Sequence, residues 1–197
     1  MVAEADGQLL TGSRPFRRAY LLDQLKQFLT YFPRNSIFLA LFEWADSSLR
    51  VIDETRTLLY ETVLTPARDC LSSRLFAIHH EMERGNVNTT KAAFEHAVSC
   101  DLCKSNTGLW IKFIQFCSLQ RELRPKAKDV LFRALRQCPW SKDVMMEAFL
   151  TLNRDMESSE LKGVFETMAS KGLRVHVDLD EFLEKRRNER RAQKGRG

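Results

Sequence analysis

Large apolar residues recur along this chain at spacings of three and four positions, in segments separated by glycine, proline and asparagine. Such a period is typical of amphipathic helices that bury one face. In four of the segments an aromatic residue is followed three positions later by an apolar one; the aromatic residues are Tyr60, Phe94, Phe132 and Phe165. Their separations of 34, 38 and 33 positions fall within the range of helical-hairpin repeats, so the pattern predicts an internal repeat.

A second set of apolar residues begins 22 positions upstream of each aromatic residue. It comprises Phe38, Leu41 and Trp44 in the first repeat, Leu75 and Ile78 in the second, Trp110, Phe113 and Phe116 in the third, and Met146 and Phe149 in the fourth. A spacing of three places these residues on one stripe of a helix. Each repeat is therefore predicted to be a pair of antiparallel helices that bury both sets of residues as the repeat core.

Residues that favour helix ends separate the predicted helices. Asn88 or Thr89 is expected to cap the second helix of the second repeat, because both side chains carry the oxygen that an N-terminal cap requires. Pro125 lies where the first turn of a helix tolerates proline, and Pro139 follows the end of the same helix. Gly172 is placed to end the last helix of the fourth repeat.

Neighbouring hairpins must bury each other's apolar stripes, which predicts an all-α fold: an α-solenoid of about four antiparallel helical hairpins. Four unrelated hairpins in a bundle are the alternative. Residues 17–32 are expected to form one further helix that packs on the first hairpin, and residues 1–15 are expected to be disordered.

A short helix is predicted near the other end of the chain, where Leu179, Phe182 and Leu183 recur at helical spacing. It would either cap the array or dock a partner. The helical repeat domain is thus expected over residues 16–184, followed by a basic, flexible tail over residues 185–197.

Composition and charge narrow the classes of function. Apolar residues make up 44% of the chain and charged residues 29%, as in folded soluble proteins. Because no run of about 18 apolar residues is present and the start lacks the features of a signal peptide, an intracellular protein without a membrane span is expected. The net charge is +5 and the tail over residues 185–197 carries +6, which leaves 5 − 6 = −1 for residues 1–184.

Few residues form a pattern that indicates chemistry. Cys100 and Cys103 form a CxxC pair, which together with His96 and Cys70 could supply zinc ligands; packing as small apolar side chains is the alternative. The adjacent His79 and His80 are expected to be one half-buried and one exposed histidine. The sequence contains no phosphate-binding glycine loop or nucleophile elbow. The chain is therefore expected to be no enzyme and to need no cofactor.

Two segments of the third repeat resemble a known motif. Leu109–Phe116 contains a tryptophan and two phenylalanines, and Val130–Pro139 has an aromatic residue before small and aliphatic residues and a proline. Together they resemble a HAT, or half-a-tetratricopeptide, repeat. The first repeat is similar, with Phe38 in place of tryptophan. The second and fourth repeats carry Ser72 and Asp143 at that position, so they are assigned by periodicity alone.

More narrowly, residues 36–184 resemble the C-terminal end of the nuclear RNAi-defective (Nrde) family, chiefly in segments 134–149 and 171–183. The resemblance implies a nuclear scaffold that acts in RNA surveillance, RNA interference and splicing, with protein partners in those complexes, among them an exosome-linked RNA helicase. The helicase-contacting region of the family lies N-terminal to its repeat end, so no helicase-binding residue is assigned here. Members of the family are much longer than this chain.

Two hypotheses of function follow. In the first, the second helices of the hairpins line a face that binds protein partners. The candidate contacts are Arg56, Lys91, Arg133 and Arg136, which could instead be solvated helix surface. Dimerisation, common among HAT arrays, stays open.

In the second hypothesis the chain binds RNA through its basic tail, with Lys185, Arg186, Arg187, Arg190 and Arg191 as candidate contacts. Binding to phosphates predicts an affinity that falls steeply with salt concentration. A nuclear-import signal and a solvated end are the alternatives for the tail. The unequal repeat lengths and nearly neutral body argue against a base-reading code.

Overall fold

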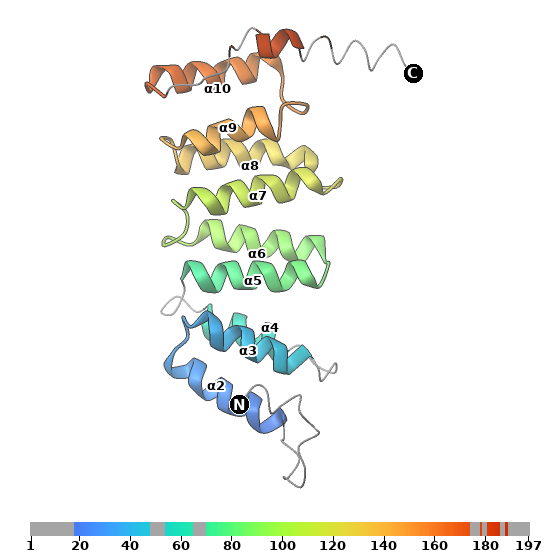
Figure 1. Ribbon diagram of the computed structural model, residues 1–197, viewed down its shortest axis with the longest axis vertical. Helices are drawn as coiled ribbons and strands as arrows, with labels where there is room; N and C mark the ends of the chain where they lie inside the picture. Colours follow the sequence, from blue (N-terminus) through green and yellow to red (C-terminus); the bar gives the residue numbers. More distant parts are fainter. Residues whose placement is uncertain are drawn as a thin grey trace. The chain divides into compact units, whose positions relative to one another are not determined.

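The computed structural model describes residues 18–47, 54–64, 70–173, 178, 181–185 and 188, and all regular secondary structure within these residues is helical (Figure 1). The all-α fold expected from the periodicity is confirmed. The chain divides into two compact units, residues 1–103 and 104–197. The segment expected to be disordered, residues 1–15, lies outside the described residues.

Unit 1 contains helices that pair with their neighbours in the chain. They are α2 (Arg18–Tyr31), α3 (Ser36–Ser47), α4 (Glu54–Leu58), the π-helical turn η1 (Leu59–Val63) that continues α4, α5 (Leu71–Glu83) and α6 (Val87–Ser99). The most extensive contacts join α2 with α3 and α5 with α6, and α3 also contacts α4 and α5. The additional helix expected over residues 17–32 corresponds to α2.

The core of unit 1 between α2 and α3 is built from leucine and phenylalanine. Leu29 and Phe42 are fully buried, and the ring of Phe28 stacks on that of Phe38 with centroids 5.5 Å apart. Burial of an apolar side chain of this size contributes about 1.5–3 kcal/mol. Helix α2 is therefore an integral part of unit 1 although it lies outside the four repeats.

Polar contacts join α3 to a helix on either side of it in unit 1. Asp46, near the end of α3, accepts hydrogen bonds from the backbone N–H of Thr55 at 2.8 Å and from its hydroxyl at 2.7 Å. The first contact satisfies a backbone donor in the first turn of α4, which has no partner within the helix. On the other side, Nδ1 of the buried His80 in α5 pairs with the carboxylate of Glu43 in α3. Both contacts fix neighbouring helices around α3.

Unit 2 contains α7 (Thr107–Leu119), α8 (Arg124–Gln137), α9 (Lys142–Leu150) and α10 (Ser158–Ser170), followed by a short helical segment at residues 181–185. Helix α7 packs on both α8 and α9, α8 also packs on α9, and α9 packs on α10. These four helices lie side by side in chain order (Figure 1).

The core of unit 2 centres on the interface of α7 with α8. Trp110 and Phe113 of α7 are buried, and Ala127, Leu131 and Ala134 of α8 are fully buried along one face. Spacings of four and three keep the last three residues on one side of the helix. Two alanines at this face let the backbones of the two helices approach closely.

The start and end of individual helices are set by residues just outside them. Asn86 caps α6 and accepts hydrogen bonds from the backbone N–H groups of Asn88 at 3.0 Å and Thr89 at 3.3 Å. The expectation that Asn88 or Thr89 is the cap was wrong, because Gly85, with φ of 73°, ends the turn early and leaves Asn86 in the extended conformation of a cap. Gly172, with φ of 69°, follows the end of α10 as expected.

The helices expected for all four repeats are present, and the residues expected in the repeat core fall into three groups. Ile78, Phe94, Trp110, Phe113, Phe116 and Phe149 are buried; Phe38, Leu41, Trp44, Phe132, Met146 and Phe165 are half-buried; Tyr60 and Leu75 are exposed.

Leu75 was expected in the core but is 43% exposed. The buried face of α5 runs through Ser73, Ala77 and Ile78 rather than through Ser72. A shift of one residue rotates the stripe by about 100° around the helix. Ser72 is polar at the position where the apolar set of this repeat was expected to begin. The buried face of α5 is therefore rotated relative to the expected one, and Leu75 lies at the surface.

Tyr60 also differs from the expectation and is 36% exposed. It lies in η1, where the wider hydrogen-bonded turn changes the phase of the helix and Leu59 and Leu64 are buried instead. The Tyr60 hydroxyl lies 3.5 Å from the carboxylate of Glu81. Burial of the ring and then the Glu81 charge raise the pKa of Tyr60 above its usual value.

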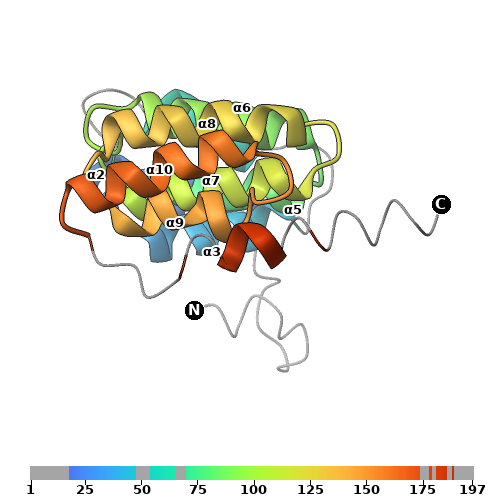
Figure 2. The same ribbon diagram turned by 90° about the horizontal axis from the view of Figure 1, so that it is seen from above.

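A short helix follows α10 and contacts unit 2 through one aromatic residue. Phe182 packs edge-on against Phe149 of α9, with ring centroids 5.8 Å apart, and Figure 2 shows the segment beside the end of α9. Asp178 accepts a hydrogen bond from the backbone N–H of Glu181 at 3.3 Å and so caps this helix. Within the described part of the chain, no helix combines the length and apolar character that a bilayer span requires.

Candidate functional site

The two candidate contacts on α8 have different surroundings. The guanidinium carbon of Arg133 lies 5.6 Å from the centroid of the Trp110 ring, and the Arg133 side chain is half-buried. Such a cation–π contact is worth about 0.5–1 kcal/mol at exposed sites and more when it is desolvated. Arg136, in the last turn of α8, is exposed. Arg133 is thus part of the packing of α8 on α7, whereas Arg136 lies on the surface.

The two candidate contacts in unit 1 are also partly engaged. Nε of Arg56 donates to the carboxylate of Glu81 at 3.0 Å, and the Glu81 side chain is only 2% exposed. Arg56 therefore neutralises a carboxylate that α5 buries, because an unpaired buried charge is costly. Lys91 on α6 is half-buried. Arg56 and Lys91 belong to unit 1, whereas Arg133 and Arg136 belong to unit 2.

The candidate RNA contacts lie at the end of the chain. Lys185 closes the short helical segment and is exposed. Arg186, Arg187, Arg190 and Arg191 lie outside the described residues, so their role stays a prediction.

The cysteine and histidine residues singled out in the sequence do not form a metal site in the described part of the chain, where no three potential ligands come together. Cys103 is fully buried and Cys100 half-buried, at the end of α6, and His96 is exposed. Of the adjacent histidines, His79 is exposed and His80 buried. All five cysteines are free thiols; Cys103, Cys117 and Cys138 are buried, and Cys70 and Cys100 are half-buried.

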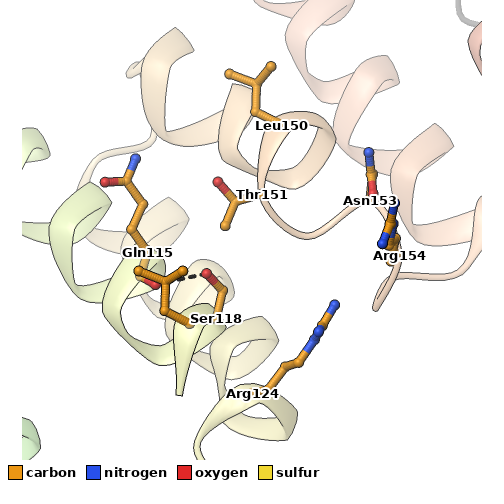
Figure 3. Close-up of a pocket in the computed structure, with 8 residues that line it drawn as sticks. Gln115, Ser118, Arg124, Leu150, Thr151, Asn153 and Arg154 are labelled. Atoms are coloured by element: carbon orange, nitrogen blue, oxygen red, sulfur yellow. Dashed lines mark hydrogen bonds between the residues drawn. The ribbon is translucent and has the colours of Figure 1, made fainter. Parts of the chain in front are cut away.

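The described residues of unit 2 form a groove at the surface. It has a volume of about 590 Å³ and is largely open to solvent. Helix ends and one loop line it: Gln115, Ser118 and Leu119 from α7, Arg124 from α8, Leu150 from α9, and Thr151, Asn153 and Arg154 from the loop that follows α9. Figure 3 shows the Arg124 and Arg154 side chains on one side of this groove and Gln115 with Ser118 on the other.

Hydrogen bonds hold the polar floor of the groove in place. The buried carboxylate of Glu147 accepts a hydrogen bond from Nε2 of Gln115 at 3.1 Å and another from the hydroxyl of Thr151. The Ser118 hydroxyl donates to the backbone carbonyl of Gln115 at 2.8 Å. Because Gln115 and Thr151 are tied to the same buried carboxylate, α7 and the end of α9 keep a fixed spacing at this site.

Two leucines form the apolar part of the groove. Leu119 is 81% exposed and Leu150 is 69% exposed. The lining contains no carboxylate, histidine or cysteine side chain that could act as an acid, base or nucleophile. The arrangement suits binding rather than catalysis.

The groove was not predicted from the sequence, although one signal of it was present. Leu119 continues the spacing of three that links Trp110, Phe113 and Phe116, so it resembles a core residue. Nine residues at about 100° each rotate it by half a turn from Trp110, toward the opposite side of α7. A helical projection of α7 would have identified Leu119 as an apolar residue off the buried stripe.

No family model matches this chain, and no solved structure matches it at a significant level. Two curated proteins do match: nuclear exosome regulator NRDE2 of Mus musculus is 25% identical over 186 residues, and NRDE2 of Homo sapiens is 24% identical over the same length. In each case the match covers 83% of this chain and 15% of the relative, so the chain spans about a seventh of the length of these proteins. The resemblance to the Nrde family is thereby confirmed, and the chain is a distant homologue of one part of the nuclear exosome regulator NRDE2.

Proposed function

We propose that this chain is a non-enzymatic nuclear scaffold segment that binds protein partners in RNA surveillance, RNA-directed silencing and splicing. The observation that carries the proposal is the homology with part of NRDE2, a protein whose name describes a regulator of the nuclear exosome. Paired helices supply extended binding surfaces, which suits a protein that acts by holding partners. The match covers 15% of the length of the relatives. That this chain shares the partners and the role of the whole regulator is therefore proposed.

We also propose a more detailed architecture for this chain. Each unit is a segment of an α-solenoid of HAT-like repeats, the repeat domain extends over residues 16–184, and the short helix at 181–185 caps its end. Three observations support it: helices pair with their sequence neighbours, Arg133 covers the Trp110 ring, and Phe182 packs on Phe149.

RNA binding through the tail is the second candidate function, favoured by the charge of +6 over residues 185–197. Lysine and arginine residues that neutralise phosphates release counterions, so the affinity would fall steeply as the salt concentration rises. Deletion of residues 185–197 would abolish RNA binding if the tail is the contact.

Affinity purification from nuclear extract tests the scaffold function. Tagged residues 1–197 and 1–184 serve as baits, the extract is treated with ribonuclease, and bound proteins are identified by mass spectrometry. We expect both baits to retain proteins of RNA-surveillance or splicing complexes. If every bound protein is lost with ribonuclease or with the tail, the helical domain is not the binding surface and the second candidate function replaces the first.

A further inference from the structure

The groove of unit 2 combines two kinds of binding group at its surface. Leu119 and Leu150 expose most of their side chains, whereas Arg124 and Arg154 supply the only formal charges among the lining residues. Leucines this exposed contribute little to the fold, and single ones need no explanation. Here two exposed leucines line the same groove as the guanidinium groups of Arg124 and Arg154. That combination matches a ligand with an apolar side chain next to a negative group.

Arg124 retains hydrogen-bonding capacity for a ligand. Its Nε donates to the carboxylate of Asp155 at 2.9 Å, and 46% of the Arg124 side chain is exposed. A guanidinium has further N–H donors on its terminal nitrogens, arranged in a planar fork that fits a carboxylate. The bond to Asp155 therefore orients the arginine without exhausting its donors.

The floor of the groove is already organised. Glu147 is 6% exposed and its carboxylate is hydrogen-bonded to Gln115 and Thr151, so its charge is compensated by hydrogen bonds inside the unit. A site whose polar groups are fixed before binding loses less conformational entropy when the ligand arrives. The volume of about 590 Å³ lies within the range of sites that hold a few side chains.

We propose that this groove binds a short acidic and apolar peptide segment of a partner protein. A large apolar side chain of the segment contacts Leu119 and Leu150, and neighbouring Asp or Glu carboxylates bind the guanidinium groups of Arg124 and Arg154. The inference rests on the proposed scaffold function in that the occupant is a protein segment.

Charge and side-chain type favour a peptide over RNA at this position. Single-stranded RNA is held by aromatic side chains on which bases stack, together with a continuous basic surface. The lining contains no aromatic residue, and its two leucines would offer nothing to phosphate or ribose. A peptide with a carboxylate next to an apolar side chain can contact both the arginines and the leucines of the groove.

Selection of peptides on the intact chain tests the proposal. A random peptide library displayed on phage is selected against purified residues 1–197, and the enriched peptides are synthesised with a fluorescent label for anisotropy measurements. We expect enrichment of Asp or Glu beside Leu or Phe. Arg154→Glu and Leu150→Ser are each expected to weaken binding by about tenfold, the effect of losing one well-placed contact.

Lys142→Glu is the matched control. It changes the net charge as much as Arg154→Glu does, but at the first residue of α9, roughly 12 Å along the helix from Leu150. Lys142 is exposed, and an acidic residue in the first turn favours the helix. Circular dichroism and thermal melting show whether each variant folds, and Leu150→Ser tests the groove independently of charge.

Several outcomes would overturn the proposal. One is enrichment of peptides without acidic residues; another is equal weakening by Lys142→Glu and Arg154→Glu. A labelled oligouridine that binds the chain and is lost with Arg154→Glu would identify the groove as an RNA contact instead. Absence of any groove-dependent peptide, while ribonuclease-treated purification still recovers partners, would refute the groove and leave the scaffold function standing. Peptides that bind as expected support the groove even if the purification recovers no surveillance protein.

Discussion

The side chain of Trp110 illustrates why a single position decides the packing of a repeat. Its ring is buried, its Nε1 donates to the backbone carbonyl of Lys104 at 2.7 Å, and Arg133 lies over one face of the ring. In the second and fourth repeats the same position is taken by Ser72 and Asp143, both exposed. A small or charged residue cannot fill that place, so the buried stripe of those repeats begins at a neighbouring residue.

Phe182→Ala tests at the residue scale whether the last short helix belongs to the fold. Truncation of a fully buried phenylalanine costs about 3–5 kcal/mol. Phe182 is half-buried and packs edge-on against Phe149, so we expect the free energy of unfolding to fall by roughly half that amount. Urea denaturation followed by circular dichroism measures the change. Glu184→Ala, at an exposed position of the same segment, is the control, and equal stability of both variants would contradict a capping role.

Among the elements, α10 is tied to α8 by an ion pair. Nζ of Lys128 lies 2.6 Å from a carboxylate oxygen of Glu160, and the other oxygen accepts a hydrogen bond from the backbone N–H of Glu157 at 2.8 Å. The hydrogen bond from Lys128 and the one from the Glu157 backbone lower the pKa of Glu160 below its usual 4.5. The hydrogen bond to Glu160 raises the pKa of Lys128 above its usual 10.5.

This ion pair predicts a pH-dependent contribution to stability. A depressed carboxyl pKa gives stabilisation that is present above the unfolded value of 4.5 and is lost as the pH falls through the folded pKa. We therefore expect wild type to melt at a higher temperature than Glu160→Gln at neutral pH, with the gap closing as the pH falls below 4.5. Thermal melts at a series of pH values measure the gap. A gap that persists in acid would show that the carboxylate charge is not its source.

The elements also show what the sequence could and could not predict. Helix positions followed from periodicity, and Pro125 lies in the first turn of α8 as expected. The cap at Asn86 was missed because it depends on the left-handed conformation of Gly85, which a list of cap-forming residues does not show. The groove was missed because it is built from residues off the buried stripes, which three separate helices and a loop bring together. The exposure of Leu75 depended on which face of α5 is buried, and that face is set by packing against both α3 and α6.

For the molecule as a whole, the division into two compact units predicts that the second can fold by itself. Phe113, Leu131, Met145 and Leu161 are buried to 1% exposure or less within residues 104–197, which give this unit its own core. We expect the isolated segment 104–197 to show a helical circular dichroism spectrum and a cooperative thermal transition.

A shorter version of this segment sharpens the test. Trp110 and Cys138 bind the backbone carbonyls of Lys104 and Ser105, so a segment that starts after Ser105 loses two anchoring hydrogen bonds. It should therefore melt at a lower temperature than 104–197. If the longer segment is itself unfolded, the core of the second unit depends on residues 1–103.

The pairing of each helix with its neighbours in the chain has a consequence for synthesis in the cell. The main helix–helix contacts, such as those of α5 with α6 and of α7 with α8, join segments separated by short turns. Contacts that are close in sequence form quickly, commonly within microseconds to milliseconds for helical proteins, whereas translation adds only about 5–20 residues per second. Each hairpin can therefore form soon after it leaves the ribosome, before the next helices of the chain have been synthesised.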